Sequence, residues 1–265
     1  MGKTTISTLN RMKVEGNKIA VITSYDASFT QQIEQAEMDV ILVGDSLGMV
    51  VQGHESTLPV TVADMVYHTA NVTRVSEQCM VIADMPFMSH GTPRQALDTA
   101  GRLMKEGGAH MVKIEGGRPQ IETVRHLTDR AVPVCGHLGL MPQSINQLGA
   151  YRVQGRDEHA AERILTDAVA LQEAGAQLLV LECVPALLAE EVTRAVDMPT
   201  IGIGAGVETD GQVLVLYDML GITSDSTPTF VRNFLADTDS VSSALAAYVK
   251  AVKDRSFPAP EHTFT

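Results

Sequence analysis

Tryptophan is absent from the 265-residue sequence, aromatic residues make up only 4% of it, and the three cysteines are far apart. None of Cys79, Cys135 and Cys183 belongs to a CxxC pair, which argues against a disulfide framework and favours a reducing compartment. Each lies in or beside an apolar run, so we interpret all three as buried thiols. Hydrophobic residues still make up 45% of the chain, enough for a large core, and we interpret the 13 scattered methionines as core filling.

Basic residues are also few, since 20 Lys and Arg stand against 32 Asp and Glu for a formal net charge of −12. A chain this acidic is not expected to bind nucleic acid or an anionic membrane. An anionic substrate would need a local positive charge from a metal ion or a placed Lys or Arg. No apolar run approaches the length of a membrane span, and residues 1–6 lack the apolar core of a signal peptide. We therefore predict a soluble cytoplasmic protein.

Short apolar runs alternate with amphipathic segments along the chain. We predict strands at 19–22, 40–43, 79–83, 110–114, 132–135, 177–181, 200–203 and 212–216. We predict helices at 6–13, 28–38, 62–75, 93–106, 119–130, 158–174, 186–196, 228–236 and 239–254. Eight such units in about 250 residues is the size of an α/β (β/α)8 (TIM) barrel. The prediction is one barrel domain over residues 1–265, with an N-terminal helix and a C-terminal helical extension; a doubly wound open sheet is the alternative.

Acidic residues stand at the carboxyl ends of four of the predicted strands. They are Asp45, Asp84, Glu115 and Glu182. Because the carboxyl ends of barrel strands all face one mouth, we expect these acids to converge. Two like charges about 4 Å apart repel by roughly 4 kcal/mol at an effective dielectric of 20, so a shared proton or a cation must offset the repulsion. Carboxylates without a His or Cys cluster favour a hard ion, Mg²⁺ before Zn²⁺. The alternative, that each acid caps the following helix, is weak for four equivalent positions.

Other polar residues are expected at the same mouth. Lys113 precedes Glu115 by two, so both point to one side of their strand, where the lysine could hold a substrate carboxylate or form an ordinary core ion pair. His137 could donate to a substrate oxygen or simply pack, while Tyr25 and Ser46 are candidate hydrogen-bond donors. These residues indicate a metal-assisted reaction of a small carboxylate-bearing substrate. A non-catalytic keto-acid-binding barrel is the alternative, but it would not need an acid at position 182.

Eight motifs, taken in order, carry a resemblance to a known family. They are TSYD at 23–26, VGDSLGM at 43–49, QGHESTLPVT at 52–61, ADMPF at 83–87, VKIEGG at 112–117, GHLGL at 136–140, LECVP at 181–185 and IGIGAG at 201–206. With them the chain resembles the ketopantoate hydroxymethyltransferases from about residue 4 to the C-terminus. The resemblance implies a (β/α)8 barrel that assembles as a homodecamer. It also implies Mg²⁺-dependent transfer of a hydroxymethyl group from 5,10-methylenetetrahydrofolate to 3-methyl-2-oxobutanoate, giving ketopantoate for pantothenate and coenzyme A synthesis.

The resemblance also assigns roles to residues at the mouth. It implies that Asp45 and Asp84 bind the metal and the substrate, that Glu115 completes the metal site, that Ser46 and Lys113 contact the substrate, and that Glu182 is the proton acceptor. Tyr25 and His137 are possible additional site residues without an assigned role.

Three residues depart from the family pattern. Met141, His90 and Arg152 stand where the family often has Thr, Tyr and Lys. None is a predicted metal ligand or the base, so the departures concern loop contacts and folate affinity rather than the reaction. Another Mg²⁺- and enolate-using group of similar architecture, the phosphoenolpyruvate mutase and isocitrate lyase group, is the rival enzyme class.

Overall fold

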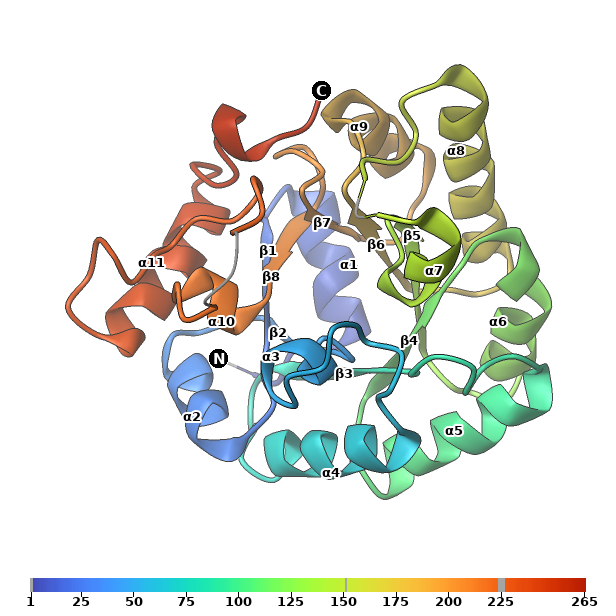
Figure 1. Cartoon of the computed structure of the whole chain (residues 1–265), viewed down its shortest axis with the longest axis horizontal. Helices are drawn as coiled ribbons and strands as arrows, with labels where there is room; N and C mark the ends of the chain where they lie inside the picture. Colours follow the sequence, from blue (N-terminus) through green and yellow to red (C-terminus); the bar gives the residue numbers. More distant parts are fainter. Residues whose placement is uncertain (1, 151, 224–226) are drawn as a thin grey trace.

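Eight parallel strands close into a barrel in the order in which they occur along the chain (Figure 1). The computed structural model describes residues 2–150, 152–223 and 227–265. The strands are β1 (Ile19–Thr23), β2 (Val40–Val43), β3 (Met80–Asp84), β4 (Met111–Glu115), β5 (Val134–Gly139), β6 (Leu178–Glu182), β7 (Thr200–Ile203) and β8 (Gly211–Leu214). Pairing of β1 with β8 closes the sheet, so the predicted barrel is confirmed and the open-sheet alternative is wrong.

Helices surround this barrel and follow most of its strands. The α-helices are α1 (Ile6–Glu15), α2 (Ala27–Gln35), α3 (Leu47–Val50), α4 (Val62–Thr73), α5 (Pro93–Lys105), α6 (Ile121–Thr128), α7 (Ile145–Leu148), α8 (Glu158–Glu173), α9 (Ala186–Ala195), α10 (Leu216–Met219) and α11 (Val241–Lys253). Short 3-10 helices form at η1 (Arg118–Gln120), η2 (Pro142–Ser144) and η3 (Pro260–His262). Thr61 and Asp64 form the capping box that begins α4, which fixes the start of that helix. No helix of the described residues is long and apolar enough to cross a membrane.

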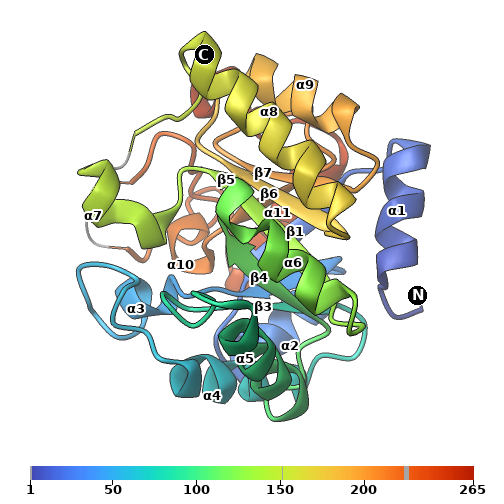
Figure 2. The same ribbon diagram turned by 90° about the vertical axis from the view of Figure 1, so that its right-hand side faces the viewer.

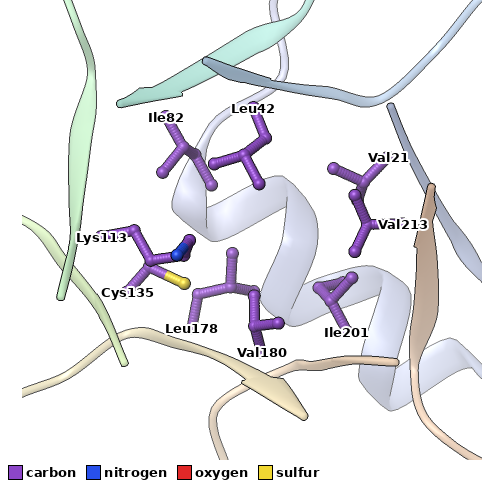
Figure 3. A pocket seen from close by; sticks show the side chains of 9 residues that line it. All are labelled: Val21, Leu42, Ile82, Lys113, Cys135, Leu178, Val180, Ile201 and Val213. Carbon is purple, nitrogen blue, oxygen red and sulfur yellow. The ribbon is translucent and has the colours of Figure 1, made fainter. Parts of the chain in front are cut away.

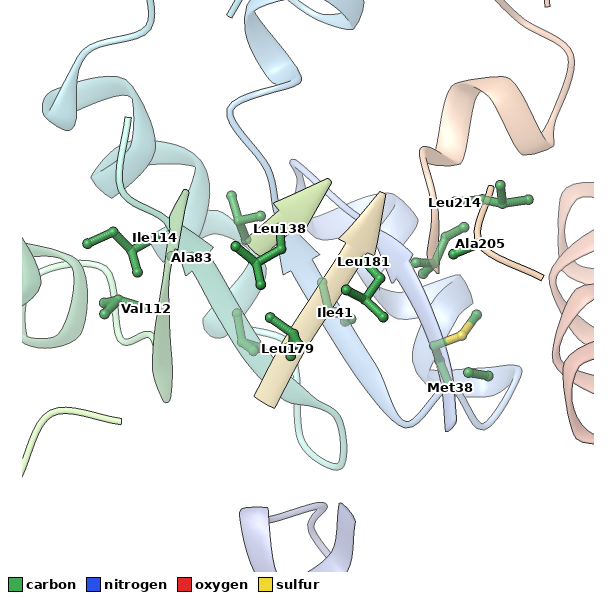
Figure 4. Close-up of a cluster of buried hydrophobic side chains, with 14 of the residues drawn as sticks. Met38, Ile41, Ala83, Val112, Ile114, Leu138, Leu179, Leu181, Ala205 and Leu214 are labelled. Atoms are coloured by element: carbon green, nitrogen blue, oxygen red, sulfur yellow. The ribbon is translucent and has the colours of Figure 1, made fainter. Parts of the chain in front are cut away.

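The strands are buried on both faces, which explains why their sequences are continuous apolar runs rather than alternating ones. Outward-facing side chains such as Ile41, Leu179 and Leu181 pack under the helices in the main core (Figure 4). Inward-facing side chains such as Val21, Leu42 and Ile201 fill the barrel interior. The three cysteines are free and buried, as predicted.

The two ends of the barrel differ in what covers them. Helix α1 lies across the amino-terminal end, where Leu9 and Met12 pack on the interior cluster (Figure 2). Lys13 of this helix donates through Nζ to the Thr193 carbonyl at 2.9 Å and pairs with Asp210 at 2.9 Å. The short helices α3, α7 and α10 lie at the opposite end. Leu9 and Met12 of α1 thus close the amino-terminal end, and the carboxyl ends of the strands, called the mouth below, lie at the opposite end.

Two sequence predictions need correction near the C-terminus. The helix predicted at 228–236 is absent, because the Asn233 side chain accepts hydrogen bonds from the backbone of Leu235 and Ala236 and so competes with helical bonding. The strand predicted at 212–216 ends at Leu214, and the chain turns there into α10. Helix α11 confirms the predicted C-terminal helical extension.

Candidate active site

The carboxyl ends of neighbouring strands bring the predicted acids together. Asp45 follows β2, and its backbone N–H donates to Asp84 Oδ2 at the end of β3 over 3.0 Å. The other oxygen of Asp84, Oδ1, lies 3.0 Å from Nζ of Lys113 on β4. Asp84 and Lys113 are direct partners in the strand register, so the sheet itself places this ion pair. Both side chains are about 5% exposed, which makes the pair part of a buried site rather than a surface contact.

Lys113 is a charged residue that lies next to apolar side chains. Its side chain enters the barrel interior beside aliphatic residues such as Ile82 and Leu178 (Figure 3). Burial alone would lower its pKa, but the charges of Asp84, Glu115 and Asp45 outweigh burial and raise the pKa above its usual value. Lys113 is therefore charged at neutral pH, and it supplies the local positive charge that an anionic substrate needs in this acidic chain.

His137 on β5 links the remaining acids. Its Nδ1 lies 3.5 Å from Oε1 of Glu115, and its Nε2 lies 3.2 Å from Oε2 of Glu182 at the end of β6. Burial and the nearby Lys113 lower the pKa of His137, but the two carboxylates outweigh them and raise it to about 9. An imidazolium here is thus held between two carboxylates. Bonding to His137 is also the main reason that the pKa of Glu115 is lowered despite its burial.

The charges at the mouth do not balance by themselves. Four carboxylates face two cations, which leaves two negative charges in a buried region. Burial, followed by the charges of Asp84 and Glu115, raises the pKa of Asp45 well above its usual value, as expected where negative charge is in excess. A divalent cation would compensate all of it. The donor set of hard carboxylate oxygens suits Mg²⁺.

The same acids also limit how such an ion could be held. Within residues 2–150, 152–223 and 227–265, no three carboxylate, imidazole or thiol groups meet in a metal-ligating arrangement. Mg²⁺ usually takes only one or two protein carboxylates and completes its shell with water and substrate. Asp45 and Asp84 fit that requirement, and Glu115, which lies beside His137 and accepts from the backbone N–H of Gln143, remains a predicted member of the metal site.

The two hydroxyl residues predicted at the mouth bond to each other. Tyr25 OH and Ser46 Oγ are 2.9 Å apart, and the Tyr25 ring stacks on Tyr217 with centroids separated by 5.9 Å. Burial is the main cause that raises the pKa of Tyr25, which keeps its hydroxyl protonated. Ser46 adjoins Asp45 at the turn where Gly44 leaves room for Ser46 Oγ, since a Cβ on Gly44 would lie 2.7 Å from that oxygen.

Sequence reasoning missed one residue of this site, Gln143. It belongs to η2, in a loop between β5 and α8 that has no periodic pattern, and it is only 7% exposed. Its side chain contacts Asp45 and its backbone contacts Glu115. The only available signal was the amide-rich composition of the loop, which does not single out one glutamine.

The three departures from the family pattern take no part in the bonds described above, as far as the described residues show. Arg152 is exposed, and Met141 precedes η2. His90 is buried, and burial lowers its pKa to about 4. In the described part of the chain, none of the three is hydrogen-bonded to the predicted ligands or to the predicted base.

Gly139→Ala is expected to lower both the melting temperature and the turnover. Gly139 ends β5 with φ at +93°, and a Cβ there would lie 2.1 Å from the carbonyl oxygen of Glu182. The N–H of Leu140 donates to the same oxygen over 2.8 Å, so the strands cannot separate without loss of that bond. We expect strain of about 1–3 kcal/mol, which calorimetry would show as a lower melting temperature. We also expect Glu182 to be displaced, which a turnover assay would show.

Gly101→Ala is the matched control for this substitution. Gly101 lies in α5 with open space around its Cα, and alanine there should raise the free energy of unfolding by about 0.5–1 kcal/mol. Wild-type melting temperature and turnover in Gly139→Ala would contradict the close-approach explanation.

The closed barrel and its buried, charged mouth define a (β/α)8-barrel enzyme. The family model for ketopantoate hydroxymethyltransferase matches residues 3–260. The chain is 57% identical over 264 residues to the 3-methyl-2-oxobutanoate hydroxymethyltransferase of Nitrosococcus oceani, covering all of both chains. It is 58% identical over 260 residues to that of Marinobacter nauticus, covering 98% of each. The chain therefore belongs to the ketopantoate hydroxymethyltransferase family and is a transferase.

Solved structures of other enzymes share its fold at low sequence identity. A 2,3-dimethylmalate lyase of the phosphoenolpyruvate mutase and isocitrate lyase superfamily is 18% identical with a TM-score of 0.62, covering 83% of each chain. A phosphonopyruvate hydrolase is 11% identical with a TM-score of 0.63, covering 97% of this chain and 99% of that one. The rival class named from sequence thus shares the barrel, while the sequence places the chain in the ketopantoate family.

Proposed function

We propose that the protein transfers a hydroxymethyl group from 5,10-methylenetetrahydrofolate to 3-methyl-2-oxobutanoate with the help of Mg²⁺. The observation that carries the proposal is the chain of contacts from Asp45 through Lys113 and His137 to Glu182, which combines an excess of buried negative charge with a fixed cation. In the overall reaction a carbon–carbon bond forms at C3 of the keto acid, water supplies the hydroxyl oxygen, and tetrahydrofolate leaves.

Asp45 and Asp84 are the residues that would hold Mg²⁺. They are joined by the 3.0 Å bond between the Asp45 N–H and Asp84 Oδ2, and burial together with the charges of Asp84 and Glu115 raises the pKa of Asp45. When bound, the ion would stabilise negative charge developing on the keto oxygen, an effect worth several kcal/mol.

Lys113 and Ser46 are suited to orient the keto acid. Lys113 is charged and buried, and it stands between Asp84 and His137 with Nζ 3.2 Å from Nδ1 of the histidine. A substrate carboxylate placed there would pair with the ammonium in a site from which water is largely excluded. Ser46 Oγ, held by Tyr25, offers a hydroxyl beside Asp45 for a second contact.

Glu182 is the proposed base. Its side chain is 15% exposed, against 4% for Glu115 and 5% for Asp84, so among these three its carboxylate is the most accessible from the mouth. Its contact with His137 is made through Oε2, and the C3 proton would be taken by its carboxylate. Removal of that proton by a placed carboxylate typically accelerates a reaction by about 10²–10⁴-fold.

Purified protein is expected to form ketopantoate from 3-methyl-2-oxobutanoate and 5,10-methylenetetrahydrofolate only while Mg²⁺ is present. Product formation followed with and without a chelator is the measurement. Restoration by added Mg²⁺ after chelation is the control. Unchanged turnover in chelator would remove the metal from the proposal, and no turnover in any condition would favour a barrel that only binds a keto acid.

Assembly and pathway remain predictions of the family resemblance. The homodecamer, and the place of the reaction in pantothenate and coenzyme A synthesis, rest on membership of the family rather than on contacts within one chain.

A further inference from the structure

Gln143 is a loop residue that bonds to two of the acids at the mouth, Asp45 and Glu115. Its side-chain Nε2 donates to Asp45 Oδ2 over 2.8 Å and to the Met85 carbonyl over 2.9 Å. Its backbone N–H donates to Glu115 Oε2 over 3.0 Å. One residue following β5 therefore connects the ends of β2, β3 and β4.

The orientation of the Gln143 amide follows from its partners. A backbone carbonyl and a carboxylate oxygen both accept hydrogen bonds, so only the NH2 end of the amide can lie between them. Both of its hydrogens are then used, and the side chain is held at two points. Since the residue is 7% exposed, water does not compete freely for these bonds.

The neutral amide of Gln143 affects Asp45 differently from a cation, because it orients the carboxylate without neutralising its charge. Lys113 pairs with Asp84 and cancels its charge, whereas the Gln143 amide fixes the direction of the Asp45 carboxylate without adding positive charge. A carboxylate has about four lone-pair directions, so an oxygen that accepts from an amide can still ligate a metal. Ligating carboxylates are commonly held in this way by a hydrogen-bonded partner outside the metal shell.

We propose that Gln143 is a positioning residue of the cation site, which aligns Asp45 through its side chain and Glu115 through its backbone N–H. The inference rests on the proposed Mg²⁺ dependence. It gives the loop between β5 and α8 a specific part in the reaction, because folding of η2 completes the alignment of acids that come from β2 and β4.

Titration calorimetry with Mg²⁺ alone tests this role. Gln143→Leu keeps the volume and removes both donors, and loss of such a partner typically weakens metal affinity by about 10–100-fold. Turnover of this variant should need a correspondingly higher Mg²⁺ concentration and recover at saturation, a split that a general packing defect would not produce. Gln147→Leu, the same change at an exposed position of α7, should bind Mg²⁺ like the wild type.

A second variant keeps the test informative if Gln143→Leu does not fold. Gln143→Asn keeps the amide but shortens it by one methylene, so that it cannot reach both acceptors, and it should show the same direction of change. Wild-type protein that binds no Mg²⁺ would instead refute the proposed metal dependence. Mg²⁺ binding by the wild type with equal or tighter binding in either folded Gln143 variant would overturn the positioning role.

Discussion

Glu182→Gln is expected to lower turnover by about 10²–10⁴-fold, because the amide cannot accept the C3 proton of the keto acid. The change keeps the size of the side chain and leaves the register of Gly139 and Glu182 between β5 and β6 intact. Binding of the keto acid should persist, since Lys113 and Ser46 remain. Exchange of the C3 proton with deuterated solvent, followed by proton NMR in the presence of Mg²⁺, isolates the proton-transfer step from the folate-dependent step.

A matched surface substitution serves as the control for this experiment, and the pKa of His137 gives a second readout. Glu191→Gln makes the same replacement at an exposed position of α9 and should leave exchange unchanged. Bonding to Glu182 is one of the contributions that hold the pKa of His137 near 9, so its pKa should fall in Glu182→Gln. Undiminished C3 exchange in Glu182→Gln would contradict the assignment of the base.

The ring of acids could be predicted from sequence because a parallel strand fixes both burial and direction. Asp45, Asp84, Glu115 and Glu182 each follow an apolar run, and the barrel takes all such ends to one mouth. The side-by-side placement of Lys113 and Glu115 followed from the two-residue period of a strand. The contacts among the acids agree with the first expectation, and the charge interaction between Lys113 and Glu115 agrees with the second.

Residues in loops could not be predicted in the same way. Gln143 reaches Asp45 across 98 positions of sequence, and nothing in a non-periodic loop encodes that distance. The helix wrongly predicted at 228–236 failed for a related reason, since the side chain of Asn233 accepts from backbone N–H groups that a helix would use. The local sequence pattern thus predicts where the strands end. The conformation of the loops depends instead on side-chain hydrogen bonds that this pattern does not show.

Asp45→Asn is expected to abolish Mg²⁺-dependent turnover, with a loss of at least about 10²-fold, and also to stabilise the fold at neutral pH without metal. The folded-state pKa of Asp45 is raised above its unfolded value, mainly by burial and then by Asp84 and Glu115. This carboxyl therefore makes its whole contribution to stability below about pH 4. The contribution is lost as the pH rises through the raised pKa of the folded state. Asparagine carries no such penalty, and its amide oxygen can still accept from Gln143.

Thermal unfolding at several pH values, with and without Mg²⁺, measures both effects. Without Mg²⁺ the variant should melt several degrees above the wild type near pH 8, since 1 kcal/mol shifts the melting temperature by about 2–4 °C in proteins of 150–250 residues, and the gap should close toward pH 4. Mg²⁺ should stabilise the wild type and not the variant, because only the wild type retains the ligand. Asp98→Asn, on the exposed face of α5, should change neither property. A variant that is less stable than the wild type at every pH, or that is still stabilised by Mg²⁺, would show that Asp45 is a structural acid rather than a residue kept for the cation at a cost in stability.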